Sequence, residues 1–168
     1  MLSKVSGISA LLLIFMLQSC ILLTGPSQDE KYAQENFTVE NGCIPPEFSK
    51  TEGTLLIILK NSEKYDKRVK ESFAAYNGKH EFVFFKQLEN APYTDLDEYQ
   101  YVFSYSGESR DYTSEGASGQ MQQGSFNVRR FYVLDRKDDK YYRANTTSSF
   151  FHSLINGYVY NLNLELAK

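Results

Sequence analysis

The pattern of apolar and polar residues divides the chain into strand-length apolar runs and segments with helical periodicity. Residues 54–59, TLLIIL, form an almost unbroken apolar run, which is typical of a strand buried on both faces. In residues 63–76, apolar side chains recur at steps of four, four and three from Tyr65, and charged residues occupy most positions between them. This spacing predicts an amphipathic helix that ends before Gly78.

The same patterning continues to the end of the chain. Residues 106–125, SGESRDYTSEGASGQMQQGS, are rich in Gly, Ser and Gln, and they read as a long loop that is either functional or disordered. Residues 150–159 repeat apolar positions at helical steps and predict a second helix. Further strands are predicted at residues 82–85, 100–105, 126–135 and 140–143.

The order β-α-β-β-β-β-α predicts an α/β fold. We expect a two-layer sandwich, in which two helices cover one face of a mixed sheet of about five strands. The predicted domain spans residues 51–168. Residues 20–50 before it are predicted as a tether, because residues 25–49 are polar, poorly periodic and contain three prolines, which is typical of an extended segment.

The N-terminus carries an apolar run that is short for a membrane span. Lys4 is the one charged residue among residues 1–19, and the run over residues 8–17 falls short of the roughly 20 apolar residues that a span needs. A short basic start and a short apolar core are typical of a secretory signal.

The residues that follow, Leu17-Gln18-Ser19-Cys20, resemble the lipobox of bacterial lipoproteins. The resemblance implies a signal peptide over residues 1–19, cleavage before Cys20 and acylation of its thiol. Residue 21 is Ile and not Asp, so the resemblance implies the outer membrane, with the domain facing the periplasm or the cell surface. An ordinary signal peptide cleaved elsewhere is one alternative. A retained anchor is the other, because Ile21-Leu22-Leu23 extends the apolar run.

The domain also resembles known envelope proteins in the order and texture of its elements. The segments "DLDEYQYVFSYS" and "FYVLDRKDDKYYR", the Gly-rich loop and the last helix are similar to those of small uncharacterised periplasm-facing lipoproteins. More distantly they resemble the lipoprotein activators of penicillin-binding proteins. Tyr141 and Tyr142 stand where the uncharacterised group tends to have Trp. The resemblance implies a fold and a compartment, and it assigns no residue a role.

Composition narrows the choice of partner and cofactor. With 13 Tyr and 12 Phe the chain is rich in residues that favour strands. A formal charge of −3 gives no basic footprint for nucleic acid. With two His and two Cys in the whole chain, a zinc site of four such ligands would need all of them at unsuitable spacings. The sequence therefore predicts no metal and no cofactor.

The residues most able to carry chemistry lack a catalytic setting. Acylation of Cys20 would leave Cys43 without a disulfide partner, and no positioned base lies near it in sequence. His80 and His152 are interpreted as boundary or surface residues, and Ser118 does not fit a nucleophile elbow. Two acidic clusters are interpreted as solvated turns: Asp95, Asp97 and Glu98, and Asp135, Asp138 and Asp139.

A local excess of basic residues in an otherwise acidic chain indicates a candidate interaction surface. Basic residues and tyrosines gather in the last two predicted strands of an otherwise acidic chain, although protection of an edge strand by Lys and Arg would also explain them. The sequence thus favours a non-enzymatic envelope lipoprotein that binds an envelope protein or polymer. The alternatives are an enzyme acting on envelope polymers and a secreted small-ligand binder. The candidate surface comprises Arg129, Arg130, Lys137, Lys140, Tyr141, Tyr142 and Arg143.

Overall fold

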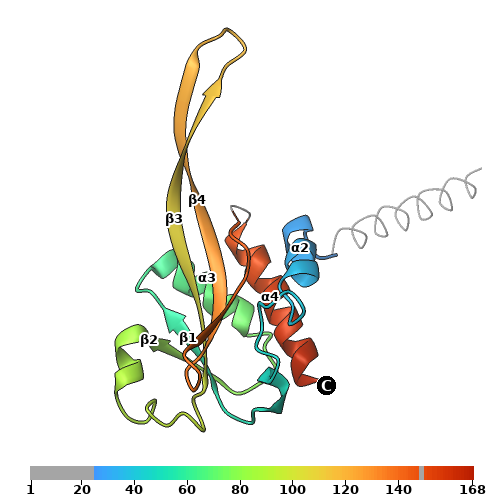
Figure 1. Ribbon diagram of the computed structural model, residues 1–168, viewed down its shortest axis with the longest axis vertical. Helices are drawn as coiled ribbons and strands as arrows, with labels where there is room; N and C mark the ends of the chain where they lie inside the picture. The colour runs from blue at the N-terminus through green and yellow to red at the C-terminus, as the bar shows by residue number, and fades with distance from the viewer. Residues whose placement is uncertain (1–24, 148–149) are drawn as a thin grey trace, which may run out of the picture.

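The computed structural model describes residues 25–147 and 150–168, and in it helices cover one face of a five-stranded sheet (Figure 1). The elements follow the chain in the order α2 (Gln28–Asn36), the 3-10 helix η2 (Phe48–Lys50), β1 (Leu55–Leu59), α3 (Glu63–Phe73), β2 (His80–Phe84), the 3-10 helix η3 (Phe85–Glu89), β3 (Tyr101–Glu115), β4 (Met121–Asp135), β5 (Lys140–Arg143) and α4 (Phe151–Leu166).

The sheet has the strand order β2-β1-β3-β4-β5. β1 pairs in parallel with β2 and with β3, whereas β4 is antiparallel to both β3 and β5. All five residues of β1 are buried, as its continuous apolar run predicted, because it has neighbours on both edges and both faces are covered. The predicted mixed sheet of five strands is confirmed.

Alternation along the strands sends side chains to two different apolar layers. On one face Leu55 and Ile57 join the large cluster that includes residues of α3 and α4, such as Phe73 and Leu154. We call this the helix side. On the other face, which we call the outer side, Leu56 packs in a smaller cluster with Val83, Leu88 and Val102. The predicted two-layer arrangement is confirmed, although three helices contribute to the described structure and not two.

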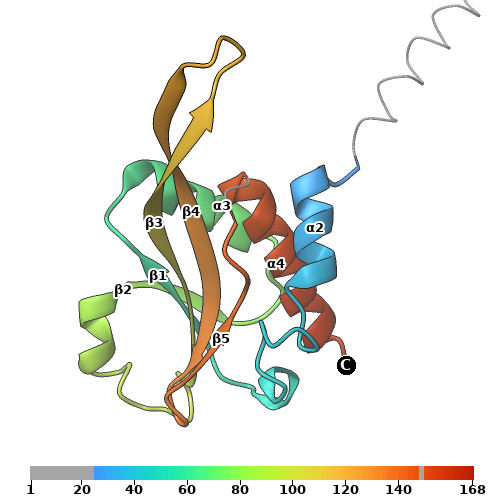
Figure 2. The same cartoon turned by 45° about the horizontal axis from the view of Figure 1, so that its top comes forward.

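The third helix, α2, lies alongside α4 (Figure 2). Ser27 caps it by accepting a hydrogen bond from the Glu30 amide at 3.2 Å. Ala33 and Phe37 are fully buried in the main cluster, together with Ile44. The structure therefore differs from the tether expected over residues 20–50: residues 28–50 are part of the folded domain, which begins before residue 51.

Close packing between α2 and α4 depends on Gly157. A Cβ atom at Gly157 would lie 2.5 Å from the carbonyl oxygen of Glu30 and 2.6 Å from Ala33 Cβ. The glycine in α4 therefore leaves room for the backbone of α2. This contact joins segments more than 120 residues apart, which is why local patterning did not reveal it.

The predicted lipobox and the signal peptide over residues 1–19 lie outside the described residues. Within residues 25–147 and 150–168, no helix combines the length and the apolar character needed to cross a membrane.

Candidate interaction surface

β3 and β4 extend far beyond the rest of the sheet as a two-stranded hairpin (Figure 1). We define residues 108–128 as the arm. Every residue of β3 from Ser106 to Glu115 is exposed. The sequence interpretation of residues 106–125 as a loop was wrong, because most of these residues belong to paired strands.

The pairing of β3 with β4 explains how so polar a segment becomes a strand. The register runs without a bulge from Tyr101–Asp135 to Glu115–Met121. The buried pairs at the base fix this register, and the ladder continues outward from them. At the tip, the Gly116 amide donates to the Gln120 carbonyl at 2.8 Å, and Gly119 adopts a φ of 79°, which glycine tolerates.

The two faces of the arm differ in chemistry. Residues paired across an antiparallel ladder share a face, so Tyr112 and Phe126 lie on one face with Gly124 and Arg110. The Tyr112 ring covers Gly124, and its centroid lies 6.2 Å from that of Phe126. Even so, Tyr112 remains 49% exposed and Phe126 41% exposed. We call this the aromatic face of the arm.

The opposite face of the arm is polar apart from Met121, which pairs with Glu115 next to the tip. It carries the paired residues Asp111 and Ser125, and then Thr113 and Gln123. Both strand edges are also open, because among the described residues β1 reaches along β3 only to Phe103, and pairing on the other edge of β4 ends at Arg129. The arm therefore offers an exposed aromatic face beside unpaired backbone groups.

The base of the arm is fastened to the domain by two arginines of the candidate surface. Arg129 donates to the Tyr65 hydroxyl, and its guanidinium lies 4.8 Å from the Tyr65 ring and 5.3 Å from the Phe151 ring. Arg130 donates to Thr146 Oγ1 at 2.7 Å. Arg129 thus has a structural role on the helix side, next to α3 and α4.

The rest of the candidate surface divides between the two sides of the sheet. Tyr142 pairs with the buried Val133 and so lies on the helix side, whereas Tyr141 and Arg143 pair with Leu134 and Tyr132 on the outer side. The Arg143 guanidinium lies 4.4 Å from the Tyr141 ring centroid, and Lys140 Nζ lies 4.8 Å from that of Tyr142. The Tyr132 and Tyr141 rings meet at 5.4 Å. The structure therefore brings Tyr141 and Arg143 together and separates them from Tyr142 and Arg129.

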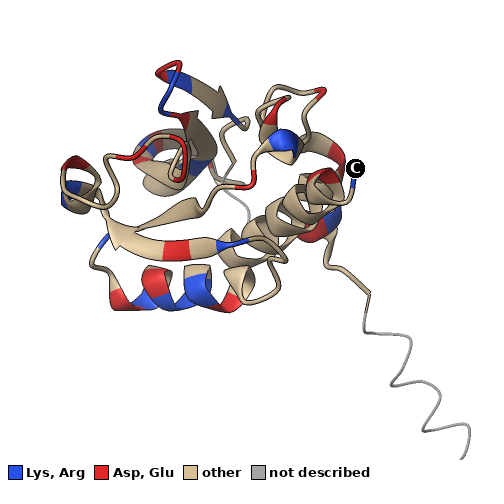
Figure 3. Ribbon diagram, turned by 90° about the horizontal axis from the view of Figure 1, so that it is seen from below, with Lys and Arg blue, Asp and Glu red and all other residues tan. Residues whose placement is uncertain are grey.

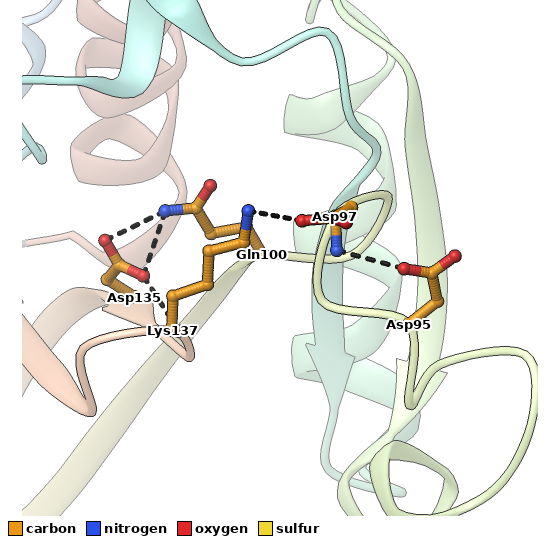
Figure 4. Close-up of polar contacts among 5 residues, drawn as sticks. All are labelled: Asp95, Asp97, Gln100, Asp135 and Lys137. Carbon is orange, nitrogen blue, oxygen red and sulfur yellow. Dashed lines mark hydrogen bonds and ion pairs between the residues drawn. The ribbon is translucent and has the colours of Figure 1, made fainter.

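Lys137 belongs to a polar network at the turn between β4 and β5 (Figure 4). Its Nζ lies 2.6 Å from Asp97 Oδ1, and its backbone amide donates to Asp135. Gln100 Nε2 donates to both carboxylate oxygens of Asp135 at 3.1 Å. The hydrogen bond and the charge of Lys137 lower the pKa of Asp97. The interpretation of the acidic clusters as solvated turns holds for Asp97, whose side chain is exposed, but not for Asp135, which is buried at the end of β4 and accepts hydrogen bonds from Gln100 and Lys137.

His80 and the buried Cys43 occupy structural settings, whereas His152 lies partly exposed in the first turn of α4. His80 Nδ1 lies 3.2 Å from the Gly78 carbonyl oxygen, between the rings of Tyr76 and Phe82. Burial raises the pKa of the Cys43 thiol to about 11, which keeps it protonated at neutral pH. Among the described residues, no group of three or more His, Cys, Asp and Glu gathers as a metal site.

The distribution of charged residues does not indicate another candidate interaction surface. In the view of Figure 3, the positions of Lys and Arg along the ribbon alternate with those of Asp and Glu. The aromatic face of the arm is an exposed aromatic pair on a projecting hairpin, and the sequence carried a signal for it in the excess of tyrosine, Tyr112 included. Compared with protein-family models and with curated protein sequences, the chain matches none of them.

Proposed function

We propose that this protein is an outer-membrane lipoprotein, anchored through Cys20, whose domain binds another envelope protein through the aromatic face of the arm. The supporting observation is the arm itself. An isolated two-stranded hairpin gains little stability in water, and here it exposes two large aromatic rings, which contact each other and remain 49% and 41% exposed. Aromatic side chains are enriched in the buried cores of protein interfaces.

A protein partner fits the arm better than a polymer does. The unpaired edges of β3 and β4 present backbone N–H and C=O groups in the spacing of a polypeptide strand. The arm carries both Arg110 and Glu108, which form an ion pair at 2.7 Å, so it has no strong charge with which to hold a polyanion. The partner therefore meets backbone edges and aromatic rings.

Photocrosslinking tests the arm with a matched control. p-Benzoylphenylalanine replaces Tyr112 on the aromatic face in one variant and Asp111 on the opposite face in another. We expect a discrete crosslinked protein in cells from position 112 and a much weaker one from position 111. Equal adducts at both positions would contradict the proposal. An adduct of two copies of this chain would replace the envelope partner with self-association.

Removal of the arm provides the second test. Arg129 exchanges both backbone hydrogen bonds with Thr147, so the neighbouring pair Glu108–Val128 is hydrogen-bonded within β3–β4 and can close a two-residue turn. Residues 109–127 are replaced by Asn-Gly. We expect an unchanged circular dichroism melting profile and loss of the crosslink from a probe placed at Glu108. Retention of that crosslink would show that the arm is not the binding element.

The anchor is tested separately by mass spectrometry of the mature N-terminus. We expect acylated Cys20 in the wild-type chain and unprocessed chain in Cys20→Ala. An unmodified N-terminus at another residue would overturn the lipoprotein assignment and leave the arm experiment unaffected.

A further inference from the structure

A pocket lies where the connections of two parallel strands leave the sheet on opposite sides. α3 follows β1 on the helix side, whereas η3 follows β2 and packs Leu88 on the outer side. In sheets with parallel strands, such a change of side opens a crevice outside the carboxyl ends of the strands, where ligands commonly bind. Here the ends of β1 and β2 line a pocket with a volume of about 570 Å³, which is a usual size for a ligand site.

The loop after β1 is held in a defined shape at this pocket. The Asp66 carboxylate accepts hydrogen bonds from the backbone amides of Lys60 at 2.9 Å and Ser62 at 3.0 Å. Between them Asn61 adopts a φ of 57°, a left-handed conformation that Asn tolerates better than most residues do. The loop therefore presents Lys60 and Asn61 to the pocket from a fixed backbone.

The walls of the pocket are largely apolar and aromatic. Ile58 comes from β1, and Ser104 and Tyr132 face each other across β3 and β4. Phe84 and Phe85 complete the lining, and they are 45% and 60% exposed. Two adjacent phenylalanines this exposed are costly in water unless something covers them, and the pocket they line gives a place for an aromatic ring.

The charged side chains that line the pocket are both positive, and the Asp66 carboxylate, which contacts the Lys60 backbone amide, is not among the lining residues. Lys60 and Lys86 belong to its lining, and no Asp or Glu side chain is among the described residues that line it. None of the ion pairs between described residues involves either lysine. Partial burial lowers the pKa of Lys60, whose Nζ lies 4.9 Å from the Tyr105 ring centroid. An anion would compensate that loss of hydration.

We propose that this pocket binds a small organic anion with an aromatic ring, its ring against Phe85 and Tyr132 and its anionic group beside Lys60 and Lys86. The site is separate from the arm, so the arm and the pocket can be tested independently.

The test uses 2-naphthalenesulfonate, which is anionic at every working pH, in calorimetric titrations of the full chain in dodecyl maltoside. Methanesulfonate supplies the charge without the ring, and 2-naphthol supplies the ring without the charge. We expect saturable binding of one equivalent of 2-naphthalenesulfonate, and binding at least about tenfold weaker for each control compound, since a lost charged contact or a lost ring contact is worth about 1.4 kcal/mol or more.

Variants locate the binding. Lys60→Met, Lys86→Met and Phe85→Ala are expected to weaken 2-naphthalenesulfonate binding about tenfold, whereas Lys31→Met on α2 and the Asn-Gly arm replacement leave it unchanged. Circular dichroism melting confirms that each variant is folded. Absence of saturable binding, equal binding of 2-naphthol, or an equal effect of Lys31→Met would each overturn the proposal.

Discussion

Asn161 joins two helices through a single buried amide. It is 5% exposed, and its Nδ2 lies within hydrogen-bonding distance of the carbonyl oxygens of Ala33, Gln34 and Phe37, at 2.9 to 3.2 Å. The Asn161 amide thus supplies a donor to the carbonyls of Gln34 and Phe37 at the end of α2, and a second donor to the Ala33 carbonyl, which also accepts the Phe37 amide at 2.8 Å. Nothing in the sequence singles out this asparagine, because its partners lie more than 120 residues away.

We expect Asn161→Ala to lower the free energy of unfolding by about 1–3 kcal/mol, since buried carbonyl groups would lose their donor. Asn161→Asp is nearly isosteric but places a carboxylate against those carbonyl oxygens, so its loss should be larger. Guanidinium denaturation of the full chain measures both, with the exposed Asn145→Asp as the control. An equal effect at position 145 would show that the interhelical hydrogen bonds contribute nothing.

Cys43 gives a second prediction at the residue scale. Burial raises the pKa of its thiol to about 11, so at pH 8 the thiolate is scarce and sheltered. In the full chain with Cys20→Ser, where Cys43 is the one remaining thiol, we expect reaction with Ellman's reagent to be negligible in buffer and complete in 6 M guanidinium. Rapid reaction in buffer would mean that the segment carrying Cys43 opens readily.

At the scale of elements, sequence patterning predicted what local residues determine. The run TLLIIL has one interpretation as a buried strand, and β1 is that strand. Sequence patterning did not predict α2 or the strands of the arm, for two physical reasons. The apolar contacts of α2 are few and are made with a distant helix, so its own sequence is mostly polar. The register of the arm is set by the buried pairs at the base of β3 and β4. Its Ser, Gly and Gln residues therefore form paired strands although their intrinsic strand propensity is low.

The candidate surface was predictable only in part, for a related reason. Basic residues and tyrosines of β4 and β5 are close in sequence, but which side of the sheet each takes depends on register. Tyr141 and Tyr142 are adjacent and yet lie on opposite sides. The exposed aromatic pair Tyr112 and Phe126 required knowledge that the two segments are paired.

Gly157 supports a prediction for the packing of α2 on α4. In an isolated helix Gly→Ala is stabilising by about 1 kcal/mol, but here the added Cβ would meet Glu30 O and Ala33 Cβ. We expect Gly157→Ala to destabilise the chain by about 1–3 kcal/mol through overpacking. Adding Ala33→Gly removes one of the two clashes and should restore part of the loss. Denaturation of the two single variants and the double variant measures this coupling, and strict additivity would contradict it.

At the scale of the whole molecule, four buried tyrosines predict the alkaline limit of stability. Burial raises the pKa of Tyr101 and Tyr105 to about 12, and it also raises the pKa values of Tyr76 and Tyr158 above the ordinary tyrosine value. In the unfolded chain tyrosine loses its proton near pH 10. Above that pH the folded state binds more protons than the unfolded state, so stability falls as pH rises, and below it this contribution is fully present.

We therefore expect an alkaline unfolding transition above pH 10, in which loss of far-ultraviolet circular dichroism coincides with a cooperative rise in absorbance at 295 nm. Tyr105→Phe should make the decline of stability with pH shallower. Ionisation of these tyrosines without loss of circular dichroism would contradict the burial that the structure assigns to them.

The pairing of β3 with β4 is continuous from the buried base of the arm to its tip. At about 3.3 Å per residue, its tip stands roughly 30 Å beyond Ser106, and no bulge interrupts the pairing that could act as a hinge. Ser104 and Tyr132, which line the pocket, are rungs of the same ladder. The arm and one wall of the pocket therefore belong to the same pair of strands, and we expect a partner that displaces the base of the arm to move Ser104 and Tyr132 with it.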